Sequence, residues 1–477
     1  MKVLFAAWEM DPYFKVGGLG DVVRSLPNAL SQLGVDVRVI MPFYKSLKLE
    51  GSLKKRVAKT EVLYGKKLQK VIIYKVINSL AKVPVYLVQN KKYLDVATSQ
   101  ETFAFFDKAV VDIIKNKVIN FIPDIIHCHD HHTGLIPFLI KNSNLKVKSV
   151  LTLHNLAYQG FSPVDVLAKL SINRSDMRLS KWEINSRKLN FLLEGIIHAD
   201  IVTTVSPTYS KEILKEMYGM GLEDVLRDYR HKLYGILNGI DIDYNYLLHF
   251  KHVPFPFLEP DEKDRAMKHY PVAEGKKLNK QFLQQQLGLK NDETIPLFAF
   301  IGRFDAKQKG IDILHKMIRR YALKNEQYQF VILGTGDPDW EERFDWLYNF
   351  YPESVSCNFV FDTKLAQIIY AAADFILIPS KFEPCGLIQM LAMAFGTLPI
   401  AHKVGGLTDS IKNRVNGYLF PEYSAKKLFE TMEKAVKIWQ KDKINHFKMI
   451  KAAMKEDFSW RRSAGEYLDL YKKLIAR

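Results

Sequence analysis

Short apolar runs rich in β-branched residues alternate along the chain with helix-length amphipathic segments. This alternation is typical of parallel βαβ units, in which helices cover a buried sheet. In the first half we expect strands at residues 3–7, 35–41, 83–88, 125–129, 149–153 and 201–205. In the second half we expect them at 297–301, 330–333, 359–361, 375–378 and 398–401. The pattern therefore predicts an α/β protein.

The chain length and one irregular segment indicate two domains. The 477 residues exceed the ~100–200 residues of a typical single domain. Residues 252–274 are rich in proline and charge and lack periodicity, so a boundary is expected between residues 238 and 261. We interpret the chain as two Rossmann-like domains facing each other.

The composition is that of a globular protein, with 48% hydrophobic and 25% charged residues. Cys128, Cys357 and Cys385 are an odd number at wide spacing, which favours a reducing compartment over a disulfide framework. The apolar run at residues 3–8 is shorter than a signal-peptide core, and no stretch approaches the ~20 apolar residues of a membrane span. We expect a cytoplasmic location without membrane insertion, or a plastid if a transit peptide has been removed.

The formal net charge of +17 can attract phosphates, nucleic acid or anionic lipid. The sequence contains no RNA-binding aromatic signature, zinc-finger spacing or basic arm, and its lysines are scattered. We therefore favour a solvated lysine-rich surface and expect no nucleic-acid partner.

A glycine-rich motif occurs twice, as KVGGLGD at residues 15–21 and KVGGLTD at residues 403–409. Each copy follows an expected strand or its short extension and precedes a helical pattern. Glycines there permit tight turns and bring backbone N–H groups close to an anion at a helix N-terminus. The alternative is that they only turn the chain into the helix.

Two cations follow the expected strand at 297–301: Arg303 and, six positions later, Lys309. Such a pair beside a helix start can neutralise a diphosphate, which predicts a phosphate leaving group. A pair of ordinary surface cations is the alternative.

Glu383 stands between the expected strand at 375–378 and a helical run at 388–395. Its carboxylate can accept hydrogen bonds from sugar hydroxyls, while the N–H groups of residues 385–387 face an anion at the helix start. The alternative is a helix-capping carboxylate, worth ~0.3–1 kcal/mol.

The stretch of residues 127–132, HCHDHH, resembles a metal cluster only superficially. Neighbouring residues on a strand point to opposite faces, and no second group of ligands completes a tetrahedral set. The end of a parallel strand is instead where ligand-contacting side chains emerge, and His154 and Asn155 follow another such strand.

Several motifs together look like the signatures of bacterial glycogen synthases and plant starch synthases, and they occur in that family's order. They are KVGGLGDV at 15–22, HNLAYQG at 154–160, LNGID at 237–241, FEPCGL at 382–387 and FSW at 458–460. The resemblance spans essentially the whole chain.

This resemblance implies a GT-B fold, with two Rossmann-like domains across a deep cleft. The implied domains are residues 1–243 on the acceptor side, residues 244–457 binding the sugar nucleotide, and a helix at 458–477 packing back on the first domain. The implied reaction moves glucose from ADP-glucose, or alternatively UDP-glucose, to the non-reducing end of an α-1,4-glucan with retention of configuration. No cofactor or bound metal is implied, and the oligomeric state stays open.

The resemblance also assigns site residues. The implied catalytic set is Lys15, His154, Arg303, Lys309 and Glu383. The implied donor-binding residues are Gly17, Gly18, Asp21, Asn238, Gly334, Cys385, Gly386 and Leu387. The residues implied to contact the acceptor or sugar are Asp130, His131, His132 and Asn155.

The sequence departs from the family pattern at three places. His131 stands where tryptophan is usual, Ile388 stands where threonine is frequent, and the bacterial lysine usually lies five rather than six residues after the arginine. These departures leave the nucleotide open and make Lys307 a competitor of Lys309. Another GT-B transferase or epimerase, or a catalytically silent glucan-binding protein, is the alternative function. A nicotinamide dehydrogenase is disfavoured because the glycine loop does not match Gly-x-Gly-x-x-Gly.

Overall fold

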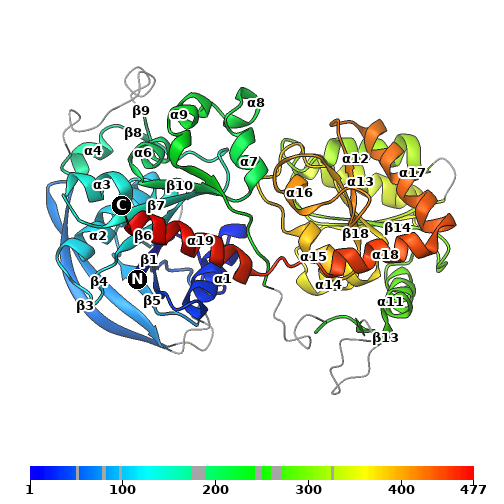
Figure 1. The fold of residues 1–477 in the computed structure, drawn as a ribbon, viewed down its shortest axis with the longest axis horizontal. Coiled ribbons are helices and arrows are strands. Elements are labelled where there is room, and N and C mark those ends of the chain that lie inside the picture. The colour runs from blue at the N-terminus through cyan, green and yellow to red at the C-terminus, as the bar shows by residue number, and fades with distance from the viewer. Residues whose placement is uncertain are drawn as a thin grey trace. The chain divides into compact units, whose positions relative to one another are not determined.

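The computed structural model describes residues 1–49, 53–77, 82–95, 99–172, 188–241, 250–258, 270–323 and 327–476 (Figure 1). The chain divides into two compact units: unit 1 is Met1–Gly239 with Ser459–Arg477, and unit 2 is Ile240–Phe458. Within the proline-rich segment at 252–274, residues 259–269 lie outside the described residues. Within the described ranges, no helix combines the length and apolar character needed to cross a membrane.

Unit 1 contains a nine-stranded sheet in the order β11-β10-β7-β6-β1-β2-β5-β4-β3. Neighbouring strands are parallel from β11 to β5, whereas β4 runs antiparallel to both β5 and β3. The strands are β1 (Lys2–Ala6), β2 (Asp36–Pro42), β3 (Leu53–Tyr64), β4 (Lys67–Ile77), β5 (Val85–Gln89), β6 (Ile125–His129), β7 (Lys148–Leu153), β10 (Ile201–Thr204) and β11 (Leu233–Gly235). All six strands expected in the first half are confirmed.

The antiparallel hairpin of β3 and β4 was not predicted. Most of β3 is exposed, and lysines interrupt its apolar positions, as at Lys54, Lys55 and Lys59. Since our strand predictions relied on buried apolar runs, a solvated edge hairpin gave no such signal.

Unit 2 contains a six-stranded parallel sheet in the order β16-β15-β14-β17-β18-β19. The strands are β14 (Leu297–Ile301), β15 (Gln329–Leu333), β16 (Val355–Asn358), β17 (Phe375–Ile378), β18 (Leu398–His402) and β19 (Tyr418–Phe420). The strand expected at 359–361 was wrong, because pairing ends at Asn358 and Phe361 is 86% exposed. Strand β16 lies at the sheet edge, where polar residues such as Ser356 are tolerated.

Helices flank both sheets. The longer ones in unit 1 are α1 (Gly18–Gln32), α2 (Gln100–Lys115), α3 (Ile136–Asn142), α6 (Phe191–His198) and α19 (Trp460–Ile475). Those in unit 2 include α11 (Val272–Gln286), α12 (Ile311–Met317), α13 (Pro338–Phe350), α14 (Thr363–Ala372), α15 (Ile388–Ala394), α16 (Gly405–Ser410), α17 (Ala425–Lys441) and α18 (Lys443–Met454). Each unit is thus a Rossmann-like α/β fold.

The C-terminal helix α19 belongs to the core of unit 1. It packs beside α1, as the red and blue helices of Figure 1 show, and buries Trp460, Tyr467 and Tyr471 in the same apolar cluster as β1. A Cβ on Gly239 would lie 2.6 Å from the Trp460 backbone nitrogen. Glycine in the motif at 237–241 therefore lets two distant segments of the chain pass closely.

Candidate active site

The loops after β14 and β17 bring Lys309 and Glu383 together in unit 2. The Nζ atom of Lys309 donates to Oε2 of Glu383 at 2.7 Å, and both side chains are largely buried. Gly310 makes this approach possible: its φ is +69°, and a Cβ there would lie 1.9 Å from the Pro379 carbonyl oxygen. The cation and the carboxylate therefore meet at the carboxyl edge of the sheet.

The carboxylate of Glu383 does not cap helix α15. Its Oε2 accepts hydrogen bonds from Lys309 and from the Ser380 hydroxyl at 2.9 Å. The N-cap of α15 is Leu387, and no side chain caps it. The capping interpretation of Glu383 is therefore not supported.

The other cations of this loop are placed differently. Arg303 is exposed, and its guanidinium donates to the Gln308 side chain at 3.3 Å. Lys307 is also exposed, whereas Lys309 faces the carboxylate. The geometry thus favours Lys309 over Lys307 as the lysine of the site.

The second glycine motif packs against the residues that follow Glu383. A Cβ on Gly406 would lie 2.1 Å from the Cys385 carbonyl oxygen, and the Gly406 N–H donates to the Glu383 carbonyl at 3.1 Å. The amide of Gln389 donates to the carbonyls of Cys385 and Gly386 at 3.2 and 2.8 Å. The sequence analysis did not predict a role for Gln389. The signal that could have identified it was a polar residue within the otherwise apolar helix α15.

Gly334 permits close packing at the neighbouring strand end. Its φ is +150°, and a Cβ would lie 1.8 Å from the Gly302 carbonyl oxygen, so only glycine fits where β14 and β15 end. Because Gly334 lies at the carboxyl edge of the sheet and has no side chain, its backbone borders the loop that carries Arg303.

The first glycine loop, in unit 1, is held by Glu9, a residue that the sequence reasoning missed. The buried Glu9 carboxylate accepts the N–H groups of Val16, Gly17 and Gly20 at 2.5, 3.1 and 3.1 Å. Burial raises the pKa of Glu9, and these hydrogen bonds oppose the rise. The sequence signal that could have identified Glu9 was a charged residue three positions after the end of the buried strand β1.

Glu9 changes the expected role of the glycine loop. The Gly17 N–H donates to a carboxylate of the protein itself, whereas a Cβ on Gly18 would meet no atom within 4 Å and thus faces open space. The Nζ atom of Lys15 and Oδ1 of Asp21 form an ion pair at 2.5 Å, and each side chain is 38% exposed. The loop therefore presents Lys15, Gly18 and Asp21 at the start of α1.

Asp130 holds the turn that carries His154. Its Oδ1 accepts the His154 backbone N–H at 2.7 Å, and burial raises the pKa of Asp130 to about 7. The His129 Nδ1 and His154 Nε2 atoms lie 3.0 Å apart in a hydrogen bond between the two rings. Burial lowers the pKa of His154 to about 3 and that of His129 well below its usual value, so both rings are neutral.

The two histidines after Asp130 pack against neighbouring residues inside unit 1. His132 stacks on Trp8 with ring centroids 4.2 Å apart, and His131 is so close to Gly160 that a Cβ there would clash. Asn155 accepts the Ala157 N–H at 3.0 Å, which orders the next turn. His131 is 7% exposed, so little of its side chain is accessible for the expected sugar contact.

Asn238 lies near the end of β11, in the motif at 237–241. It is buried, and its Oδ1 has no hydrogen-bond partner among the described residues. A buried amide oxygen without a partner is costly, which is consistent with a ligand-binding position.

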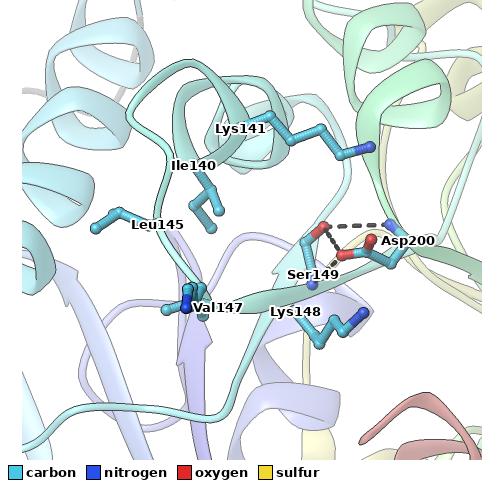
Figure 2. Close-up of a pocket in the computed structure, with 8 residues that line it drawn as sticks. Ile140, Lys141, Leu145, Val147, Lys148, Ser149 and Asp200 are labelled. Carbon is cyan, nitrogen blue, oxygen red and sulfur yellow. Dashed lines mark hydrogen bonds between the residues drawn. The ribbon is translucent and has the colours of Figure 1, made fainter. Parts of the chain in front are cut away.

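A cavity of about 300 Å³ lies elsewhere in unit 1 (Figure 2). Its lining is Ile140, Lys141, Leu145, Lys146, Val147, Lys148, Ser149 and Asp200. Figure 2 shows the Asp200 carboxylate accepting from the N–H and hydroxyl of Ser149, at 2.7 and 2.9 Å. This cavity lies at the amino end of β7, opposite the carboxyl edge, and is not part of the candidate site.

Known proteins resemble the chain over its full length. The family model "Starch synthase catalytic domain" matches residues 2–228, and "Glycosyl transferases group 1" matches residues 279–455. A glycogen synthase of Streptococcus sanguinis is 37% identical, with 100% of both chains covered. The catalytic domain of starch synthase IV from Arabidopsis thaliana, solved bound to ADP and acarbose, is 30% identical with a TM-score of 0.85, covering 100% of this chain and 99% of that one.

A more distant structure supports the fold alone. Sucrose-phosphate synthase from Thermosynechococcus elongatus superposes with a TM-score of 0.61 at 20% identity, covering 100% of this chain and 99% of that one. Together with the two α/β units, whose sheets are parallel apart from the β3–β4 edge of unit 1, these similarities confirm the predicted GT-B class.

Proposed function

Because the chain belongs to the family of bacterial glycogen synthases and plant starch synthases, we propose that it transfers glucose from ADP-glucose to the non-reducing end of an α-1,4-glucan. The observation that carries this proposal is the contact between Lys309 and Glu383 at the carboxyl edge of the unit 2 sheet. This contact supports the proposal, because glucosyl transfer develops negative charge on the leaving diphosphate and positive charge on the sugar, and a neighbouring cation and anion can stabilise the two.

In the proposed mechanism, the diphosphate leaves while Arg303 and Lys309 take up its growing negative charge. The acceptor's terminal 4-hydroxyl attacks from the face that the diphosphate leaves and passes its proton to the departing phosphate oxygen. The bond from the anomeric carbon to the acceptor oxygen thus replaces the bond to the phosphate oxygen, and configuration is retained. The transition state resembles an oxocarbenium ion, and Glu383 stabilises its positive charge. We propose Lys15, Asp21 and Asn238 as the substrate-binding residues of unit 1.

ADP-glucose is the proposed donor, with UDP-glucose as the alternative. The ADP bound to the Arabidopsis starch synthase IV domain supports an adenine nucleotide. We further propose that the enzyme needs no metal or cofactor and acts in the cytoplasm on a glucan, without a nucleic-acid partner.

Initial rates with ADP-glucose and UDP-glucose on glycogen test this function. We expect transfer from ADP-glucose to exceed transfer from UDP-glucose and the new linkage to be α-1,4, as read from the anomeric proton by NMR. The absence of transfer from either donor by a folded protein would contradict the proposal and favour a silent glucan-binding protein.

A further inference from the structure

The turn between β17 and α15 contains a buried serine, Ser380, three residues before Glu383. Its side-chain hydroxyl donates to Oε2 of Glu383 at 2.9 Å, the same oxygen that accepts the Lys309 ammonium at 2.7 Å. Ser380 is 1% exposed and Glu383 6% exposed, so water has little access to this contact. One carboxylate oxygen therefore receives two donors from two different loops.

Ser380 is itself fixed by the end of strand β18. The Nδ1 atom of His402 lies 2.8 Å from the Ser380 carbonyl oxygen, and because a carbonyl can only accept, Nδ1 carries the proton. The His402 ring is buried and stacks on Phe420 with centroids 5.3 Å apart. The backbone of Ser380 is therefore held independently of Glu383.

The two groups that donate to Glu383 have different roles in the proposed reaction. In the proposed function, Lys309 also stabilises the negative charge of the departing diphosphate. The Ser380 hydroxyl does not contact the leaving group, so it keeps its hydrogen bond to the carboxylate while the diphosphate departs. A glutamate side chain has three rotatable bonds, and a fixed donor restricts them.

We propose that Ser380 is a positioning residue, which holds the Glu383 carboxylate toward the anomeric carbon during glucosyl transfer. The proposal rests on the proposed function and deepens it. It differs from a purely structural role, in which the hydroxyl only satisfies a buried carboxylate and its loss lowers stability without slowing the folded enzyme.

Three variants at this position test the proposal, with Ser356→Ala as a matched control. Ser356 is also a buried serine of unit 2, on the edge strand β16. Ser380→Ala should lower kcat at least about tenfold, as loss of a hydrogen bond to a charged group does, with the KM for ADP-glucose within about twofold of the parent. Ser380→Thr keeps the hydroxyl and should recover kcat to within about threefold of the parent.

Ser380→Cys covers the case in which the alanine variant does not fold. A thiol nearly preserves the shape but is a weak donor, so its kcat should lie below that of Ser380→Thr. Ser356→Ala should keep the parent kcat. Thermal unfolding of every variant verifies that the compared proteins are folded.

The outcomes separate the two proposals. An active parent with a folded Ser380→Ala or Ser380→Cys variant at the parent kcat would overturn the positioning role and leave the proposed function standing. Equal losses in the alanine and threonine variants would also overturn it, because the hydroxyl would then be irrelevant. A folded parent without glucose transfer would overturn both.

Discussion

The ammonium of Lys309 lies 2.7 Å from the carboxylate of Glu383, although 74 positions separate the two residues in the sequence. Their approach depends on Gly310, whose missing side chain lets the Lys309 loop lie against Pro379 at the end of β17. A larger residue at position 310 would push the two loops apart, so the charge pair is a property of the tertiary structure.

We predict that Lys309→Ala slows glucose transfer strongly. Loss of one group that stabilises the leaving charge costs roughly 3–4 kcal/mol, which is about two to three orders of magnitude in kcat. The matched variant Lys307→Ala removes an exposed lysine two positions away and should keep nearly the parent rate. The reverse result in steady-state kinetics would assign the role to Lys307.

We predict that Glu9→Gln destabilises unit 1 and slows the enzyme. The carboxylate accepts three backbone N–H groups, whereas a glutamine amide offers one oxygen and brings donors of its own. At least one N–H then lacks an acceptor, at a cost of about 1–3 kcal/mol in unfolding free energy. The displaced loop should also move Lys15.

Chemical denaturation and transfer rates check the Glu9 prediction. Glu101→Gln is the control, because the Glu101–Lys169 ion pair is exposed and such pairs contribute about 0–1 kcal/mol. Parent-like stability and rate in Glu9→Gln would show that the glycine loop does not depend on this carboxylate.

We predict that His131 makes unit 1 sensitive to mild acid. Burial lowers the pKa of His131 from 6.5 to about 4, so the folded protein keeps the ring neutral while the unfolded chain protonates it. The neutral His131 ring makes its full contribution to stability above pH 6.5, and this contribution is lost as the pH falls toward 4. At pH 5 the free energy of unfolding is lower by up to about 2 kcal/mol.

His131→Phe keeps an aromatic ring and removes this titration. The drop in unfolding free energy between pH 7 and pH 5 should therefore be smaller than in the parent. Asp130 and other buried groups titrate in both proteins, so their effects cancel in the comparison. Phe103→Leu alters a neighbouring ring without removing a titrating group and should keep the parent's pH dependence. Equal drops in parent and His131→Phe would contradict the prediction.

We predict that glucose transfer does not depend on a divalent ion, because Arg303 and Lys309 provide positive charge for the diphosphate. Rates measured in excess EDTA should match those without chelator. Activity lost on chelation and restored by one divalent ion would show that the side-chain cations are insufficient.

Buried strands were the most predictable part of the fold. The expected strands at 297–301 and 375–378 coincide with β14 and β17, since both faces of a central parallel strand are apolar. The hairpin of β3 and β4 was missed because its alternation is broken by solvated lysines. Pattern reasoning therefore works where burial is complete and fails where strands face water.

The sequence predicted which loops carry the site residues but not which of their side chains contact one another. Motifs located the segments that carry Lys309, Glu383 and His154, since strand ends in α/β sheets gather ligand-contacting residues. The choice of Lys309 over Lys307 depends on how the loop folds around Gly310, which residue types alone do not specify. Glu9 and Ser380 were missed because their hydrogen bonds join segments whose proximity only the folded chain establishes.

The last prediction concerns the charge of Glu383. Glu383→Gln keeps the shape and the acceptor for the Ser380 hydroxyl but removes the negative charge beside the anomeric carbon. If that charge stabilises the transition state, kcat should fall at least ~100-fold while donor affinity changes little. A structural carboxylate would instead lower stability and leave the folded enzyme nearly unaffected. Transfer rates, ADP-glucose binding by calorimetry and thermal unfolding distinguish the two. A folded, donor-binding Glu383→Gln enzyme within about threefold of the parent rate, which is less than ~1 kcal/mol of barrier, would refute the catalytic role.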